Sequence, residues 1–331
     1  MMKIVIAGGG VAAFEAALAA RKNCSDCEIE IHSAESVPPY RRPALPGLIC
    51  ADEADFAKMF IRKEDFYREN DLKLVLNSRL TGMDTVAGKA LFNGTAWVVY
   101  DKLILATGGK SFVPPVPGAE GKNVLTLRNL TDLQILRQKI AAGLSEIIVV
   151  GGGILGLEIV DSLLKCHCKV TLLERSDRLL SRDVSPENSR LMQQSLAGLA
   201  GLTLICNAQT GAVTPEGVLL ETGEQIPGQL VLFSTGSRPE LSGISPEIAV
   251  DKGIIVDKYM QTNIPGVFSC GDNTQFDGKV CGLYSTSRAM AAVAGANASG
   301  TLTEYIPKVN TIMLNTLGFK MSSDGKVTVT K

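Results

Sequence analysis

The chain has 331 residues, 45% of them apolar and 20% charged, a balance typical of a folded protein and not of a disordered one. That length accommodates two ordinary domains, each with its own core. The formal net charge of −1 excludes an electrostatic argument for nucleic acid or an acidic surface as the partner.

The N-terminal stretch from Ile4 to Ala20 is apolar, but its three glycines and Glu15 argue against a signal peptide. No other run is long and apolar enough to span a membrane, so we expect a cytoplasmic protein whose eight cysteines are reduced thiols. Cys24 and Cys27 form a C-x-x-C pair that we expect in a solvent-side loop, with metal binding or redox chemistry as the alternative. The two histidines are too few to suggest a His-dependent hydrolase or a His-ligated metal site.

The first elements along the chain form a βαβ pattern. A uniformly apolar run, Ile4 to Ala7, predicts a buried parallel strand. The glycine turn Gly8-Gly9-Gly10 follows, then a helical pattern and a second strand at Glu28–His32. Further along, Asn93-Gly94 is placed to turn a hairpin of two antiparallel strands.

The same pattern occurs a second time. The stretch from Lys3 to Glu15 aligns without gaps on Glu146 to Glu158, an offset of 151 − 8 = 143 residues. A strand at Lys169–Leu173 again follows the helix. Leu103–Gly108 also resembles Val231–Gly236, in the same order. The chain therefore contains a duplicated nucleotide-binding unit and not a short solenoid repeat.

Both glycine turns match the dinucleotide fingerprint. In Gly8-x-Gly10-x-x-Ala13 and Gly151-x-Gly153-x-x-Gly156, the first glycine permits the tight turn and the second lets the backbone approach a pyrophosphate. The third position is small so that helix and strand pack closely. The phosphates would then lie on N–H groups at the positive end of the helix.

An acidic residue follows each turn near the distance at which the fingerprint places it. Glu174 lies 174 − 156 = 18 residues after the last glycine of the second turn, and Glu35 lies 35 − 13 = 22 residues after Ala13. A carboxylate at Glu174 would accept hydrogen bonds from the ribose hydroxyls and repel a 2′-phosphate, so we expect NADH in preference to NADPH, although Arg175 follows it.

Several ordered motifs add a family resemblance. From Lys3 to about Ile306, the chain resembles the FAD-dependent pyridine nucleotide–disulfide oxidoreductases, on the branch of rubredoxin reductases and nitrite-reductase-type NADH dehydrogenases. Besides the two glycine turns, the motifs are Pro39-Tyr40-Arg41-Arg42-Pro43, Tyr100-Asp-Lys-Leu-Ile-Leu-Ala-Thr-Gly108, Gly236-Ser-Arg-Pro239 and Gly266-Val-Phe-Ser-Cys-Gly-Asp272.

The resemblance implies an α/β fold of two Rossmann-like domains, with the NAD domain (113–244) inserted in a discontinuous FAD domain (1–112 and 245–303). It implies that residues of the first turn and three later segments bind FAD: Gly8, Gly10, Val11, Ala12, Ala13, Glu35, Arg42, Ala106, Thr107, Gly108, Gly271 and Asp272. Ala34 competes with Glu35 for the ribose position. The implied NAD residues are Gly151, Gly153, Ile154, Leu155, Gly156, Glu158, Glu174 and Gly236. The stretch Leu283–Gly300 is expected to be a helix that begins near the flavin.

The chain departs from the family pattern at three places, and each departure affects the expected chemistry around the flavin. A cysteine pair four residues apart near the flavin is absent from 40–47, so we do not expect a redox-active disulfide. Where many electron-transfer relatives carry Leu-Ser-Lys, this chain has Leu45-Pro46-Gly47, so a lysine beside the flavin is missing. Only 304–331 remains of the C-terminal interface domain, enough for a hairpin of Thr311–Leu317 with Lys326–Thr330, which leaves the flavin open to solvent or to a partner.

The expected function is transfer of a hydride from NADH to FAD, followed by delivery of electrons to a small redox protein such as rubredoxin or an iron–sulfur protein. No side chain is expected to act as the catalytic group, because the flavin is itself the redox centre, and no metal is expected. Two alternatives stay open: an NADH oxidase that reduces O₂, and a non-enzymatic subunit for sensing or assembly that binds FAD and NADH.

Overall fold

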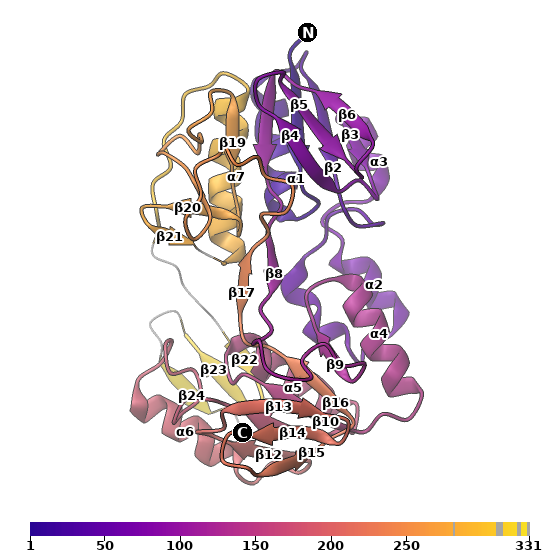
Figure 1. Cartoon of the computed structure of the whole chain (residues 1–331), viewed down its shortest axis with the longest axis vertical. Helices are drawn as coiled ribbons and strands as arrows, with labels where there is room; N and C mark the ends of the chain where they lie inside the picture. The colour runs from indigo at the N-terminus through magenta and orange to yellow at the C-terminus, as the bar shows by residue number, and fades with distance from the viewer. Residues whose placement is uncertain (281, 309–313, 323–325, 330–331) are drawn as a thin grey trace. The chain divides into compact units, whose positions relative to one another are not determined.

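The computed structural model describes residues 1–280, 282–308, 314–322 and 326–329, apart from the side chains of residues 53 and 54. The chain forms two compact units, each made of three separate segments (Figure 1). The first consists of Met1–Arg41, Ala57–Lys110 and Ser237–Asn310, and the second of Arg42–Phe56, Ser111–Gly236 and Thr311–Lys331.

A five-stranded parallel sheet forms the centre of the first unit. Its strands lie in the order β19-β7-β1-β2-β3, with the bounds Val267–Ser269, Lys102–Leu105, Lys3–Ala7, Glu28–His32 and Leu72–Val75. Side chains of β1 and β7 such as Ile4 and Leu103 have no exposed surface, because the sheet is covered on both faces. The expected strand at Glu28–His32 is confirmed at both ends.

Two helices of the first unit pack tightly on each other: α1 (Val11–Asn23) and α7 (Tyr284–Ala298). A Cβ atom at Gly295 would lie 2.2 Å from the carbonyl oxygen of Ala16, so this glycine permits the close approach of the two helices. The helix expected over Leu283–Gly300 is thereby confirmed, with Leu283 as its N-cap residue.

Smaller elements complete the first unit. One antiparallel sheet contains β4 (Leu80–Asp84), β5 (Lys89–Phe92) and β6 (Ala96–Val99). A mixed sheet contains β18 (Ile254–Ile255), β20 (Thr274–Phe276) and β21 (Lys279–Val280), in which β20 pairs in parallel with β18 and antiparallel with β21. Asn93 and Gly94 take positive φ angles of 52° and 73° between β5 and β6, which confirms the predicted hairpin turn. Helix α3 (Glu64–Glu69) also belongs to this unit, and α2 (Glu53–Met59) begins in the second unit and ends in the first.

The second unit repeats this plan. Its parallel sheet has the order β12-β11-β10-β16-β9, with the bounds Leu202–Ile205, Lys169–Leu173, Glu146–Val150, Leu230–Phe233 and Val124–Thr126. The helices are α4 (Leu130–Ala141), α5 (Ile154–Lys165) and α6 (Pro186–Leu196). An antiparallel sheet again accompanies them, made of β13 (Thr210–Thr214), β14 (Gly217–Leu220) and β15 (Gln225–Pro227).

The C-terminal segment differs from the predicted hairpin. Three strands, β22 (Leu314–Thr316), β23 (Phe319–Met321) and β24 (Val327–Val329), form an antiparallel sheet in which β23 pairs with both others. The predicted direct pairing of Thr311–Leu317 with Lys326–Thr330 is wrong, and parts of both ranges lie outside the described residues. Leu317 and Gly318, at φ 51° and 76°, turn the chain back at once, which inserts β23 between the two predicted strands.

Apart from shifts of a few residues at other boundaries, the compact units differ from the expected domain ranges in three places. Residues 42–56 and 311–331 lie in the second unit, and 237–244 lie in the first. The guanidinium of Arg137 on α4 explains the first difference, because its Nη1 donates to the carbonyl oxygens of Leu48 (2.6 Å), Ile49 (3.1 Å) and Ala51 (2.8 Å). The chain passes between the units through β8 (Gly109–Ser111) and β17 (Ser237–Pro239), which pair as a two-stranded sheet.

The structure also corrects the expectation for the cysteines. Four of them are paired as disulfides, Cys24–Cys27 and Cys50–Cys166, with Cα–Cα distances of 5.6 and 5.7 Å. The expectation that all eight are reduced thiols is therefore wrong for these four. Cys50 and Cys166 are 116 residues apart in sequence, and only the fold brings them together. Among the described residues, no helix is long and apolar enough to cross a membrane.

Candidate nucleotide-binding sites

The first glycine turn joins β1 to α1, and its shape requires glycine. Gly8 has a φ of +151°, and a Cβ atom there would lie 2.0 Å from the carbonyl oxygen of Ala106. Ala106 follows β7, the strand that pairs with β1. The turn is thus held against the loop that begins at Ala106 and continues through Thr107 and Gly108, the residues predicted for the same site.

The start of α1 offers backbone N–H groups to a ligand. Gly10 is the N-cap residue and has no side chain to accept a hydrogen bond from the first turn. The first helical bond runs from the N–H of Phe14 to the carbonyl oxygen of Gly10 (3.2 Å), so the N–H groups of Val11, Ala12 and Ala13 have no partner within the helix. A pyrophosphate fits this cradle, because the N–H groups and the helix dipole both favour an anion.

A loop from the C-terminal third of the chain meets the same helix end. A Cβ atom at Gly271 would lie 3.1 Å from the Cβ of Ala12. Asp272 accepts a hydrogen bond from the Ser287 hydroxyl at 3.0 Å, which holds its carboxylate at the first turn of α7. The structure therefore brings the predicted Gly271-Asp272 pair next to the glycine turn although more than 250 residues separate them in sequence.

Glu35 and Arg42 lie in different units. Glu35 follows β2 in the first unit, where its Oε2 accepts a hydrogen bond from the Tyr40 hydroxyl at 2.8 Å. The neighbouring Ala34 is exposed, and its methyl side chain cannot form a hydrogen bond to a ribose. Arg42 begins a short 3₁₀ helix (Arg42–Ala44) in the second unit, and its Nη1 donates to the carbonyl oxygen of Arg128 at 2.9 Å.

The second glycine turn joins β10 to α5, and three of its positions require or favour glycine for different physical reasons. Gly151 has a φ of +114°, and its Cβ would lie 2.4 Å from the carbonyl oxygen of Ser234. A Cβ at Gly156 would lie 2.0 Å from the carbonyl oxygen of Gly151, so helix and strand pack as closely as the fingerprint requires. At Gly153 a Cβ would meet nothing within 4 Å, which is the open space a pyrophosphate needs. Ile154 and Leu155 form the first turn of the helix.

Glu174 is held at the end of β11 by two backbone groups. Its Oε2 accepts from the N–H of Gly152 at 2.6 Å and its Oε1 from the N–H of Ser176 at 2.7 Å. These bonds fix the carboxylate beside the glycine turn, where a ribose would lie. Gly152 was missed among the predicted site residues, although its place between Gly151 and Gly153 was a visible signal.

Two further predicted NAD residues lie around this turn. Glu158 is half-buried on α5, and burial, followed by the charge of Asp161, raises the pKa of its carboxyl group. Gly236 follows β16 with a φ of +102°, and its carbonyl oxygen accepts from the N–H of Phe112 at 2.9 Å.

Comparison with known proteins agrees with this geometry. The model of the pyridine nucleotide-disulphide oxidoreductase family matches residues 2–300. The chain belongs to this family. As a member it is an oxidoreductase, and its cofactors are FAD and a pyridine nucleotide, as the family resemblance implied.

Several individual relatives are similar over most of the chain. The nitrite reductase [NAD(P)H] of Bacillus subtilis is 30% identical over 98% of this chain and 41% of its own length. The rubredoxin-NAD(+) reductase of Pseudomonas putida is 30% identical over 82% of the chain and 71% of its own length. The crystal structure of NADH:rubredoxin oxidoreductase from Clostridium acetobutylicum superposes with a TM-score of 0.83 at 27% identity, covering 96% of this chain and 80% of that one. The chain thus spans less than half of the nitrite reductase.

One buried residue of the first site was not predicted. Asn273 has no exposed surface, and its Nδ2 donates to the carbonyl oxygen of Leu105 and to the Ser269 hydroxyl, both at 3.0 Å. These bonds tie the loop of Gly271 and Asp272 to the end of β7. Its position directly after Gly271-Asp272 indicated that Asn273 lies near the site, but only the tertiary contacts show that it anchors the loop.

Proposed function

We propose that this flavoprotein oxidises NADH and passes the electrons to a small one-electron carrier of the rubredoxin or iron–sulfur type. The observation that carries the proposal is the pair of glycine turns, each built at the end of a central parallel strand. One lies with the Gly271-Asp272 loop, and the other with the anchored carboxylate of Glu174. The relatives named for rubredoxin reduction support the acceptor class.

In this proposal the first unit binds FAD and the second binds the nicotinamide nucleotide. The N–H groups of Val11 to Ala13 would hold the FAD pyrophosphate, and Asp272, oriented by Ser287, would bind the ribityl side. Thr107 would lie against the bound FAD, and it is held in place because its hydroxyl donates to the carbonyl oxygen of Glu240 at 2.7 Å. When bound, the flavin supplies a two-electron acceptor for hydride and a donor of single electrons.

The chain's own residues would select NADH over NADPH. Both carboxylate oxygens of Glu174 already accept from backbone N–H groups, so the carboxylate is held in place. A 2′-phosphate would meet this negative charge, whereas the ribose hydroxyls of NADH would donate to it.

We also propose that neither disulfide lies in this electron path. The 13 residues of α1 separate the first glycine turn from Cys24, about 20 Å at 1.5 Å per residue. Cys166 likewise caps the end of α5 opposite Gly153. The expected cytoplasmic location stays part of the proposal.

Anaerobic titration tests this function. Purified protein carrying FAD is titrated with NADH and, separately, with NADPH, while the flavin absorbance is followed. We expect NADH to bleach the band at lower concentration, and reduced protein to be reoxidised rapidly by rubredoxin or by a ferredoxin. Bleaching without reoxidation by any carrier would contradict the proposed acceptor, and rapid stoichiometric O₂ consumption would favour an oxidase. Absence of turnover with any acceptor, artificial dyes included, would favour a sensing or assembly role.

A further inference from the structure

The Cys24–Cys27 disulfide lies in the connection between α1 and β2, where its two cysteines differ in burial. Cys24, the C-cap residue of α1, is half-buried, and Ser25 and Asp26 after it are exposed. Cys27 is 3% exposed and belongs to the hydrophobic core of the first unit. Cys24 is therefore the more accessible of the two cysteines to an incoming thiol.

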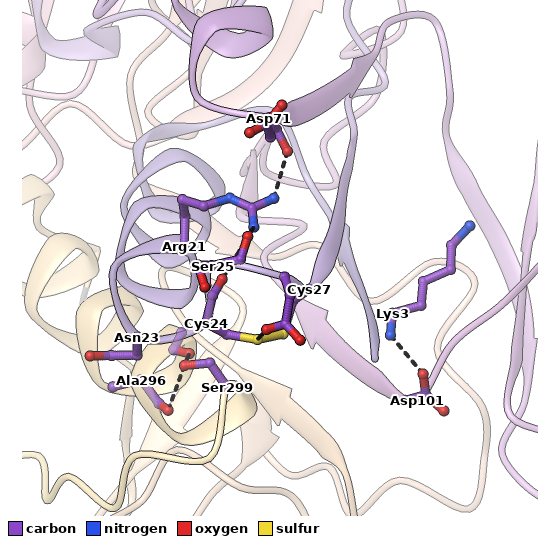
Figure 2. The surroundings of a disulfide bond; sticks show 12 residues. Lys3, Arg21, Asn23, Cys24, Ser25, Cys27, Asp71, Asp101, Ala296 and Ser299 are labelled. Atoms are coloured by element: carbon purple, nitrogen blue, oxygen red, sulfur yellow. Dashed lines mark hydrogen bonds between the residues drawn. A yellow bond between two sulfur atoms is a disulfide. The ribbon is translucent and has the colours of Figure 1, made fainter. Parts of the chain in front are cut away.

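The corner around the disulfide is held by bonds that do not depend on it (Figure 2). Arg21 extends from α1, and its Nη1 donates to the carbonyl oxygens of Cys24 (3.1 Å) and Ser25 (2.7 Å). Its Nη2 donates to the carbonyl oxygen of Asp71 (2.7 Å), just before β3. Its Nε donates to the carbonyl oxygen of Asn70 (3.2 Å). One guanidinium thus links the disulfide loop to the neighbouring strand, so the loop can keep its place when the S–S bond is open.

From these observations we propose that Cys24–Cys27 is a reversible thiol–disulfide exchange site, attacked at Cys24. Its reductant is a thiol outside this chain and not the NADH that this enzyme oxidises. An accessible sulfur next to a buried partner is the arrangement that exchange requires, because the first sulfur accepts the external thiolate and the second then resolves or re-forms the bond.

The reaction balances as two exchange steps. The thiolate of an external dithiol attacks the Cys24 sulfur, a mixed disulfide forms, and the Cys27 sulfur leaves and takes a proton. The second thiolate of the dithiol attacks its own sulfur in the mixed disulfide and releases Cys24, which also takes a proton. The external dithiol becomes a disulfide and supplies both electrons. A monothiol performs only the first step and leaves an adduct on Cys24.

The Asp26 carboxylate would modulate the first step. Its Oδ1 lies 3.5 Å from the Cys24 sulfur, and an attacking thiolate is an anion that the carboxylate repels. Asp26→Asn should therefore speed the attack by about fivefold at low salt, an advantage that shrinks as salt screens the charge. Glu187→Gln, an exposed acid in the second unit, is the matched control.

Peptide mapping tests the proposal on the native, FAD-loaded protein. Trypsin cleaves after Lys22 and Arg41, so both sulfurs fall in one peptide, 23–41. The protein is treated with dithiothreitol or with glutathione, quenched with acid, alkylated and digested. We expect dithiothreitol to give two alkyl groups on this peptide while the flavin absorbance and circular dichroism stay unchanged. Glutathione should give an adduct on Cys24.

Single variants separate the two sulfurs. In Cys27→Ser the remaining Cys24 should react with oxidised glutathione at least about tenfold faster than the remaining Cys27 does in Cys24→Ser. Cys206→Ser, which removes a cysteine that is free in the structure, should leave peptide 23–41 unaffected.

Three results would overturn the proposal. The first is reduction of the pair only after denaturation, and the second is equal reactivity of the two sulfurs. The third is reduction of the pair by NADH alone under anaerobic conditions, which would place it in the enzyme's own electron path. None of these depends on which carrier accepts the flavin's electrons, so the test is independent of the proposed acceptor.

Discussion

Gly8 and Gly153 occupy similar turns, but an added Cβ atom would meet different surroundings. At Gly8 it would meet the backbone of this chain, and at Gly153 it would meet open space. The first glycine is therefore required for folding, and the second is available for a ligand. The fingerprint assigns the tight turn to its first glycine and the approach to a pyrophosphate to its second, and the surroundings of Gly8 and Gly153 agree with these two roles.

Gly153→Ala should separate binding from stability. Gly153 has a φ of −81° and a ψ of −177°, which alanine adopts without strain, so the free energy of unfolding should stay within about 0.5 kcal/mol. The methyl group would occupy the space expected for the pyrophosphate, so KM for NADH should rise about tenfold or more. Steady-state kinetics and urea denaturation measure both effects. Gly198→Ala, whose Cβ also meets nothing, is the control, and an unchanged KM would exclude a pyrophosphate at this turn.

Glu174→Gln should weaken the choice between the two nicotinamide nucleotides. The amide keeps the shape of the side chain but removes the negative charge and one acceptor from the Gly152 and Ser176 N–H groups. We expect the ratio of kcat/KM for NADH over NADPH to fall about tenfold, mostly through KM. Glu216→Gln changes an exposed acid of the same unit and should leave the ratio unaltered.

At the scale of elements, neighbouring strands of the first unit share one buried charge. Glu30 on β2 is 2% exposed, and its Oε1 lies 3.0 Å from Lys3 Nζ on β1 and 2.5 Å from Lys73 Nζ on β3. Its Oε2 lies 3.1 Å from His32 Nε2, and the His32 ring stacks on Phe92 with centroids 3.9 Å apart. Burial opposes ionisation of Glu30, but its bonds to Lys73, Lys3 and His32 outweigh this and lower its pKa to about 2.

This charge should make the protein sensitive to acid. The folded-state pKa of Glu30 lies below the unfolded value, so its contribution is complete above about pH 5 and is lost as the pH falls toward 2. The pKa of His32 is also lowered, chiefly by burial. The folded protein should therefore begin to lose stability as the pH falls through the ordinary pKa of histidine, which adds to the effect of Glu30.

Glu30→Gln should lower the free energy of unfolding at pH 7 by about 1–3 kcal/mol, since it removes charge-assisted hydrogen bonds in a buried site. The difference from wild type should shrink as the pH falls below 5. Urea titrations at several pH values measure it. Glu28→Gln, on the same strand but exposed, should show a smaller and less pH-dependent effect. A difference that stays constant down to pH 3 would contradict the ion-pair explanation.

At the scale of the whole molecule, the Cys50–Cys166 disulfide fastens residues 42–56 to the second unit. This segment carries Arg42, predicted for FAD, while α5 begins at the turn predicted for NADH. The bond closes a loop with a sequence separation of 116 residues, whereas Cys24–Cys27 closes one with a separation of 3. The entropy removed from the unfolded chain grows with loop length, so the two disulfides should differ in their effect on stability.

Cys50→Ser should lower the free energy of unfolding of the oxidised protein by about 4–5 kcal/mol, and Cys24→Ser by about 2 kcal/mol. Urea denaturation without reductant measures both. With reductant present throughout, each variant should approach the stability of reduced wild type. If Cys24→Ser proved the more damaging variant, loop closure would not explain these effects.

The sequence by itself determined the features that depend on local rules. Strands alternate with helices around the glycine turns, and Asn93-Gly94 turns a hairpin, because backbone conformation and apolar patterning are encoded within a few residues. The duplicated pattern also predicted two parallel sheets and the binding of two dinucleotides before any tertiary contact was known.

The tertiary structure alone decided what depends on residues far apart in the chain. It paired Cys50 with Cys166, and placed residues 42–56 on Arg137. It also gathered Lys3 and Lys73 around Glu30, and inserted β23 between the two predicted C-terminal strands. The energies of these contacts arise only when distant segments meet, and no short motif records which segments those will be.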